Sequence, residues 1–292
     1  FFLFFFYKDV YYIIITKNNM EFQLVNLTIT FLLTGLASGL IAGLLGVGGG
    51  IISVPISYFI LLNLGYSIDV VMHVAIASSL GTIVFTSISS IRSHINLQNV
   101  EISVIKKWAP GIVFGSVIGS ISASKIHGEI LVAIFICLAF LISINMFFQK
   151  KIIIIANDLP QSHSINFITS GVIGFLSVLI GIGGGSFSVP TLSAYSKPMH
   201  RAVGTSAVIG FFIALPAAIT YIFTGRDILN LPPYSFGYVN VLIVLLISST
   251  SVFTAHFGAK LSSKTKTTTL KKIFAVFLLC TCISLIVEHF VF

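Results

Sequence analysis

The residues with the clearest chemical potential are two runs of glycine that occur in matched parts of the chain. One copy reads G-L-L-G-V-G-G-G-I-I-S-V-P from Gly43 to Pro55, and the other reads V-L-I-G-I-G-G-G-S-F-S-V-P from Val178 to Pro190. Glycine tolerates positive φ and lets another group approach closely, and a following helix presents free N–H groups and a positive dipole end. The pattern therefore predicts two backbone sites that together hold an anion without a charged side chain.

We expect the binding residues to be these glycines and the hydroxyl side chains near them. Three serines follow the glycines within one or two helical turns, and a second hydroxyl cluster lies in the next apolar segment of each half. Two alternatives stay open: the glycines only permit close helix packing, and each hydroxyl bonds to the carbonyl four residues earlier. The candidate set is Gly48, Gly49, Gly50, Ser53, Ser78, Ser79, Gly183, Gly184, Gly185, Ser186, Ser188, Thr205 and Ser206.

A pair of histidines also occupies matched positions. His73 opens the stretch H-V-A-I-A-S-S, and His200 opens H-R-A-V-G-T-S. Imidazole changes charge near neutral pH, so either histidine is a candidate for proton coupling. A packed or interfacial histidine without a chemical role is the alternative.

Several kinds of site are excluded by what the sequence lacks. All eight acidic residues fall in loops or at the ends of apolar segments, whereas cation pumps typically place carboxylates inside the membrane. The glycine runs lack the G-K-[ST] of a phosphate-binding loop, and no cluster has metal-ligand spacing. We therefore expect a small anionic or neutral ligand and no metal, cofactor or nucleic acid.

The elements that must position these residues are membrane helices. Of 292 residues, 56% are hydrophobic and 8% are charged, against about 25% charged in a soluble domain. The chain is thus predicted to be an all-α integral membrane protein in contact with the lipid bilayer. Ten apolar segments cover residues 26–47, 51–65, 70–91, 104–124 and 129–148, then 165–182, 186–196, 202–224, 237–258 and 271–290.

Two of these segments are short for crossing a bilayer: segment 186–196 has far too few residues, and segment 51–65 is marginal, so a full crossing stays open there. A spanning helix needs about 20 residues, which segments 51–65 and 186–196 lack, and both follow a triple glycine. We expect about eight transmembrane helices plus short re-entrant or broken helices. The tips of these broken helices would lie inside the protein, where irregular backbone can be satisfied.

Loop charges predict the orientation of the segments. If all ten alternate sides, twelve Lys and Arg residues fall on one side, and after Met20 the other side has only Lys125 and Arg226. The positive side is then cytoplasmic, and the net charge of +8 reflects topology. Five segments per half make two inverted repeats.

The predicted domain limits follow the same division. Residues 20–148 form the first transmembrane repeat, 149–164 a linker, and 165–292 the second repeat. Residues 1–19 are apolar but interrupted by Lys8 and Asp9 and show no signal-peptide order. We interpret them as a doubtful N-terminal extension.

The doubled G-x-G-G-G-x-x-x-V-P pattern and the His-x-A-x-[AG]-[ST]-S stretch resemble those of the sulfite exporter TauE/SafE family of permeases. This resemblance covers Asn26 to the C-terminus. It implies a multi-pass secondary carrier of the bacterial plasma membrane, not an enzyme, that moves sulfite or another sulfur-containing anion such as a sulfonate by alternating access.

Two other classes of function stay open. Cys137, Cys280 and Cys282 lie in apolar segments, where cysteine usually acts as a small hydrophobic residue. A membrane-embedded sulfur-transfer enzyme that uses one of these thiols is the first alternative. A passive anion channel is the second.

Overall fold

A computed structural model describes residues 20–148, 154–262 and 267–291, and the chain there is almost entirely helical. The prediction of an all-α membrane protein is confirmed, because each of the ten apolar segments coincides with a helix. The helices are α2 (Met20–Leu45), α3 (Gly50–Asn63), α4 (Ile68–Asn96), α5 (Ile102–Ser124), α6 (Gly128–Phe148), α7 (His163–Ile180), α8 (Gly185–Ala194), α9 (Met199–Thr224), α10 (Val241–Ser262) and α11 (Thr267–Val291).

Three boundaries differ from expectation or lie outside the described residues. The segment expected to begin at residue 237 starts at Val241, because β1 (Ser235–Phe236) and β2 (Val239–Asn240) form a hairpin before it. Gly237 supplies the positive φ of that turn, 55°. Residues 1–19, interpreted as a doubtful extension, and residues 149–153 of the linker are not described; residues 154–162 are non-helical.

Seven described helices are long and apolar enough to cross a membrane: α2, α4, α5, α6, α7, α9 and α10. The two helices that follow the glycine runs are short, as expected, with 14 residues in α3 and 10 in α8. Within α4 the most apolar window is 72% buried, against 39–44% in the other six spans. Helix α4 is therefore the central helix of the bundle.

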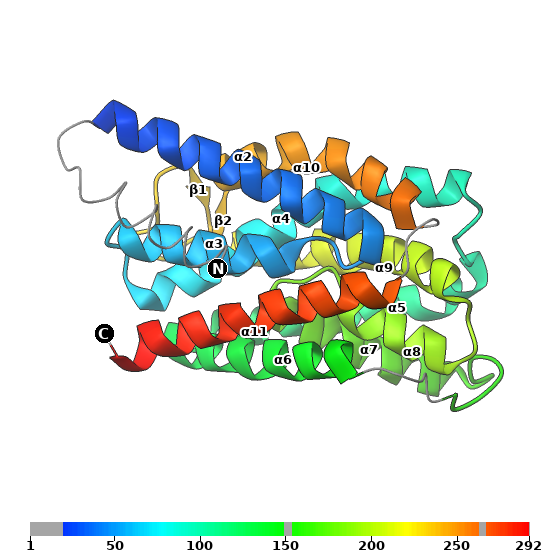
Figure 1. Ribbon diagram of the computed structural model, residues 1–292. Coiled ribbons are helices and arrows are strands. Elements are labelled where there is room, and N and C mark those ends of the chain that lie inside the picture. Colours follow the sequence, from blue (N-terminus) through cyan, green and yellow to red (C-terminus); the bar gives the residue numbers. More distant parts are fainter. Residues whose placement is uncertain (1–19, 149–153, 263–266, 292) are drawn as a thin grey trace.

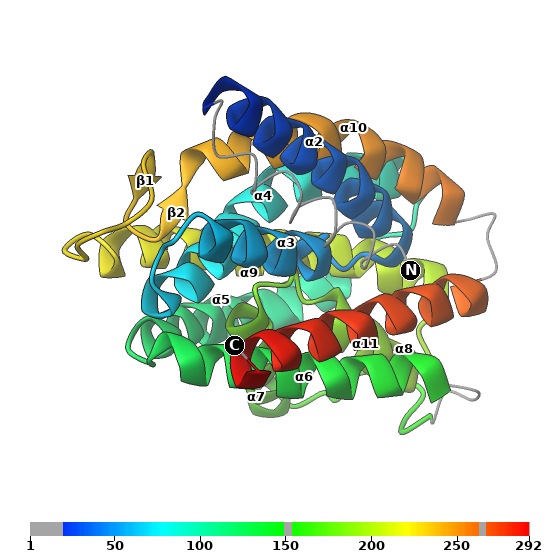
Figure 2. The same cartoon turned by 60° about the vertical axis from the view of Figure 1, so that its left-hand side comes forward.

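The remaining helices pack around this centre in pairs (Figure 1). Helix α2 lies along α10, α5 lies along α7, and α6 lies along α11; both views show this last pair at one side of the molecule (Figures 1 and 2). Helix α4 also contacts α9. The first helix of each half thus packs on the fourth helix of the other half, so the halves are interlocked.

Two glycine stripes explain how closely the interlocked helices approach. Gly35 and Gly39 of α2 face α10 so tightly that an added Cβ would collide with the carbonyl oxygens of Ile247 and Ser251. Gly115 of α5 faces the backbone of α7 in the same way. Small residues let helix backbones meet in a membrane, where apolar burial alone does not drive association. The full stripes are Gly35, Gly39 and Gly43 in α2, and Gly111, Gly115 and Gly119 in α5.

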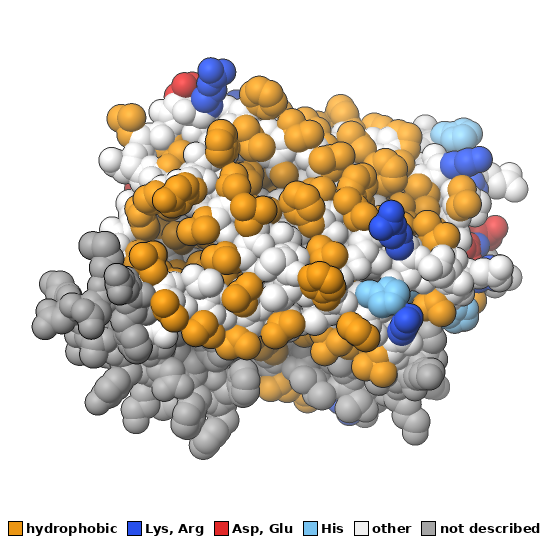
Figure 3. All heavy atoms as spheres, turned by 90° about the horizontal axis from the view of Figure 1, so that it is seen from above, with side chains coloured by type: hydrophobic (Ala, Val, Ile, Leu, Met, Phe, Trp, Pro, Cys, Tyr) orange, Lys and Arg blue, Asp and Glu red, His pale blue; other side chains and the backbone are white. Residues whose placement is uncertain are grey.

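The outer surface suits a lipid environment. On the face formed by α2 and α10, hydrophobic side chains cover most of the visible surface, and Lys, Arg and His side chains gather toward its right-hand end (Figure 3). Exposed hydrophobic side chains include Phe253 and Phe257 of α10, at 69% and 64% exposure. A broad apolar surface of this kind requires a bilayer or a partner to cover it.

Candidate functional site

The two glycine tips meet at the centre of the bundle. The backbone N–H of Gly183 donates a 3.0 Å hydrogen bond to the carbonyl oxygen of Val47. A Cβ added to Gly48 would lie 2.9 Å from the Cα of Gly183. Backbone therefore touches backbone between segments that are far apart in the sequence.

Each tip ends in a glycine that caps a short helix. Gly49 precedes α3 with φ 79°, and Gly184 precedes α8 with φ 80°. A left-handed conformation costs other residues about 1–2 kcal/mol, which is why glycine fits here. The first N–H groups of a helix have no partner within it, so two positive helix ends are brought to the same region.

The neighbouring glycines are also required for packing. A Cβ on Gly50 would strike the carbonyl oxygen of Gly181, and a Cβ on Gly185 would strike that of Gly46. The packing role left open from the sequence is thus part of the structure. The N–H of Gly183 is used in this contact, by its bond to Val47, whereas the first N–H groups of α3 and α8 have no partner within their own helices.

Four of the candidate hydroxyls form two matched hydrogen bonds beside the tips. The Oγ atoms of Ser53 and Ser79 lie 2.9 Å apart, and those of Ser188 and Ser206 lie 2.7 Å apart. Ser79 also donates to the carbonyl oxygen of Gly181 at 2.8 Å. These bonds tie α3 to α4 and α8 to α9, so the structure brings these four serines together with the glycines.

Ser78 and Thr205 have a different position from the one expected. The Oγ of Ser78 accepts a 2.9 Å hydrogen bond from the N–H of Asn240, at the start of α10. The Oγ1 of Thr205 accepts a 3.0 Å bond from the N–H of Glu101, at the start of α5. Both hydroxyls therefore hold the N-terminus of a neighbouring helix, and neither bonds to a tip.

Ser186, the second residue of α8, is the candidate whose hydroxyl group makes no hydrogen bond to the described residues. Its side chain is 6% exposed. A buried hydroxyl without a partner costs free energy, so such an atom is a natural donor for a bound ligand.

The two histidines occupy opposite kinds of environment. His73 is 2% exposed, its ring stacks on Tyr238 with centroids 4.9 Å apart, and its Nδ1 and Nε2 lie 2.8 Å and 3.1 Å from the carbonyl oxygens of Asp69 and Ala123. His200 is exposed at the start of α9. It lines a pocket of about 400 Å³ together with Asn99 of the α4–α5 loop and Ser262 of α10.

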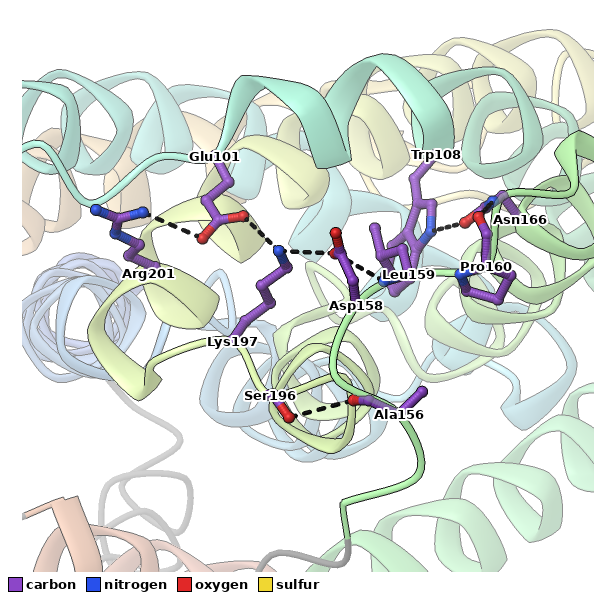
Figure 4. A network of polar contacts seen from close by, with 10 residues as sticks. All are labelled: Glu101, Trp108, Ala156, Asp158, Leu159, Pro160, Asn166, Ser196, Lys197 and Arg201. Carbon is purple, nitrogen blue, oxygen red and sulfur yellow. Dashed lines mark hydrogen bonds and ion pairs between the residues drawn. The ribbon is translucent and has the colours of Figure 1, made fainter.

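Beside this pocket, an ion-pair network joins three loops (Figure 4). The Nζ of Lys197 lies 3.2 Å from Glu101 and 2.9 Å from Asp158, and Arg201 approaches Glu101 at 3.5 Å. Hydrogen bonding to Lys197 lowers the pKa of Asp158, and the same contact raises the pKa of Lys197. The network ties the linker to both halves of the chain.

The described thiols lie away from the glycine tips. Cys137 is exposed on α6, and Cys282 is buried on α11, 3.7 Å from the carbonyl oxygen of Ile136. Helix α11 packs mainly on α6. Among the described residues, no group of three or more His, Cys, Asp or Glu side chains could hold a metal ion.

Sequence reasoning missed three features of this region. The spacing Gly-x-x-x-Gly-x-x-x-Gly in α2 and α5 was visible and signals close helix packing. The stacking of Tyr238 on His73 and the Glu101 network had no local signal. Tyr238 lies 165 residues after His73, and Lys197 lies 96 residues after Glu101, so neither contact can be found from a local pattern.

Comparisons with known proteins agree with this architecture. A family model described as sulfite exporter TauE/SafE matches residues 31–285. A "probable membrane transporter protein" of Haemophilus influenzae is 33% identical over 261 residues, which are 88% of this chain and 97% of that protein. A protein of the same description from Methanocaldococcus jannaschii is 29% identical over 84% of this chain and 90% of its own length. In Bacillus subtilis, the probable membrane transporter protein YunE is 27% identical over 87% of this chain and 95% of its own length. No solved structure matches significantly.

Proposed function

The chain belongs to the sulfite exporter TauE/SafE family, and from this membership we infer that it is a multi-pass membrane transporter that moves a small anion. Within that class we propose a sulfur oxyanion, sulfite or an organosulfonate, as the substrate. The membrane would be the plasma membrane of a bacterium.

The observation that carries the anion proposal is the meeting of two helix N-termini at the glycine tips. Gly49 and Gly184 each start a helix there, and the buried hydroxyl of Ser186 has no hydrogen-bond partner in the described part of the chain. No Asp or Glu of the sequence lies within these tips or their helices α3 and α8. Two helix N-termini without a nearby carboxylate favour negative charge.

We propose that transport proceeds by alternating access between two inverted repeats. The interlocked packing of α2 on α10 and α5 on α7 supports two equivalent units. The contact between Gly48 and Gly183 leaves no room for a substrate between them, so binding requires the tips to part. Rocking of one repeat against the other would part them.

The pocket at His200 supports entry from the side that loop charge assigns to the cytoplasm. It is lined by His200 and Val203, and a Cβ on Gly46 would meet the carbonyl oxygen of Val203. The pocket thus adjoins the first glycine tip. In this scheme His200 and His73 are the candidates for proton coupling, one at each end of the path.

The experiment is uptake of labelled sulfite into proteoliposomes, with and without a pH gradient. Saturable uptake that the gradient raises and sulfonates compete supports a coupled carrier. Uptake that never exceeds the equilibrium level would indicate a channel, and loss of activity in a cysteine-free variant would favour the sulfur-transfer enzyme.

A matched pair of variants tests the glycine tip itself. Gly184→Val should abolish uptake. Gly65→Val is the control, since Gly65 has φ 86° but no atom within 4 Å of an added Cβ. Normal uptake by folded Gly184→Val protein would exclude the anion site at the tips.

A further inference from the structure

A second hollow in the molecule lies between α4 and α10, on the outside of the bundle. Its volume is about 450 Å³. Phe85 and Ile88 form its apolar part, and Arg92, Ser93, Asn96 and His256 form its polar part. None of these residues belongs to the glycine tips or to the pocket at His200.

The lining changes from apolar to basic along α4. Phe85 and Ile88 are 47% and 43% exposed, although they lie within a membrane-spanning helix. Arg92 lies four residues before Asn96, the last residue of α4, which places it about 6 Å from the helix end at 1.5 Å per residue. The apolar part therefore faces the hydrocarbon and the basic part lies near the level of the headgroups.

The polar part is held in place by bonds between the two helices. The Oγ of Ser93 lies 2.6 Å from the Nδ1 of His256. Ser89 of α4 donates a 2.6 Å hydrogen bond to the carbonyl oxygen of Val252 in α10. These contacts fix the wall of the hollow, so Arg92 and Asn96 project beside a pre-formed surface and not from a lone helix.

Among the described residues, no acidic side chain pairs with Arg92. The three ion pairs between described residues join Glu101 and Asp158 to Lys197 and Arg201, and none includes Arg92. No acidic side chain lines the hollow. By the loop charges this end is cytoplasmic, where anionic lipids attract basic residues.

We propose that this hollow binds the phosphate of an anionic phospholipid. Arg92 pairs with the phosphate as a planar donor fork, Asn96 and His256 add polar contacts, and an acyl chain lies along Phe85 and Ile88. A free inorganic anion would use the basic part but leave the apolar part uncovered. The proposal does not depend on which substrate is transported.

The test is native mass spectrometry of the full-length, delipidated protein titrated with phosphatidylglycerol or phosphatidylcholine. Wild type should bind phosphatidylglycerol in preference. Arg92→Gln should weaken that binding about fivefold, the effect of one basic residue at an anionic surface. Arg92→Lys keeps the charge but loses the planar donor fork, so it should weaken binding by less than Arg92→Gln. Ile88→Ser should weaken binding by making the acyl-chain wall polar.

The control variant is Arg226→Gln, which removes the same charge from an exposed residue just after α9. It should retain binding within twofold. Equal losses in Arg92→Gln and Arg226→Gln, or equal binding of phosphatidylcholine, would overturn the proposal. So would full displacement of the lipid by millimolar glycerol phosphate, because the hollow would then be a site for a free anion.

Discussion

Helices α4 and α9 each hold the N-terminus of a neighbouring helix through a hydroxyl group, but the side chains around these two contacts differ. At one end Ser78 accepts from the N–H that starts α10, and at the other Thr205 accepts from the N–H that starts α5. Beyond Ser78 lie His73 and Tyr238, stacked and buried. Beyond Thr205 lie an exposed His200, a pocket and the ion pairs of Glu101.

The repeated sequence thus sets the contacts between helices, while the side chains at each end determine how easily water and ligands reach it. The aromatic stack at the His73 end is buried, whereas the His200 end opens on a pocket and includes the half-exposed Arg201. We infer that the His200 end is the easier one to open.

The largest effect is expected from alanine at the helix-capping glycines. A Cβ on Gly49 would lie 2.6 Å from the backbone oxygen of Ser38, but a Cβ on Gly184 would meet the flexible end of Ile213. The left-handed conformation alone costs alanine about 1–2 kcal/mol. Gly184→Ala should therefore lower the free energy of unfolding by about that amount, and Gly49→Ala by more. Thermal unfolding in detergent measures both, with Gly65→Ala as the strain-only control. Equal shifts in all three variants would show that the tips are not tightly packed.

The two serine pairs should differ in how much stability is lost when one member is replaced by alanine, with smaller losses than at the glycines. Ser79→Ala removes the bond to Ser53 and the donor to the Gly181 carbonyl, so we expect a loss of about 1–3 kcal/mol for a buried group left unpaired. Ser206→Ala removes one shared bond to Ser188, worth about 0.5–1.5 kcal/mol. Urea or thermal unfolding of the purified variants gives the order, and a reversed order would refute the asymmetry.

The histidines should differ in what they disturb. His73→Ala loses the stack on Tyr238, worth about 0.5–1.5 kcal/mol beyond the buried area, and two bonds to carbonyl oxygens, so it should lower stability by more than the stack alone. His200→Ala, at an exposed position, should leave the unfolding midpoint within experimental error while slowing uptake severalfold. Parallel unfolding and proteoliposome assays decide this; a destabilised His200→Ala protein would contradict the open pocket.

The smallest effect concerns pH. The pKa of Asp158 is below its ordinary 3.8, so its stabilisation is present above that pH and is lost as pH falls through the lowered value. The pKa of Lys197 is above 10.5, so its stabilisation is present below that pH and is lost as pH rises further. Because Asp158 is 71% exposed, the amplitude should be about 0.5 kcal/mol or less. Asp158→Asn should flatten the acid side of the stability profile; an unchanged acid limb would show that the contact is not formed.

Apolar runs and glycines made the helices predictable. All ten segments were found because a membrane helix needs a continuous apolar stretch, and Gly49 and Gly184 marked the breaks. The start of α10 was wrong because the apolar run continues through the β1–β2 hairpin. Hydrophobicity alone does not distinguish a short apolar strand from the first turn of a helix.

The candidate site was predictable only in part. The matched motifs predicted Ser53 and Ser79 as site residues, and these two hydroxyls are hydrogen-bonded to each other. The motifs predicted Ser78 equally, but its hydroxyl accepts from Asn240 at the start of α10. Two adjacent residues of a helix point in different directions, and the sequence alone does not tell which direction faces the tip. The partner of each side chain depends on long-range packing.

The contact of the glycine tips has the form of an interface between two copies of one protein. Gly50 meets Gly181 and Gly185 meets Gly46, pairs related by an exchange of positions 135 apart, while Gly48 meets its own counterpart Gly183. Homodimers make contacts of this self-complementary kind, in which one patch serves both partners. A mutation in such a patch would have acted twice in a dimer of single units. In this single chain each half can change alone. One polypeptide can therefore have the two different ends described above, whereas a symmetric dimer of identical units cannot.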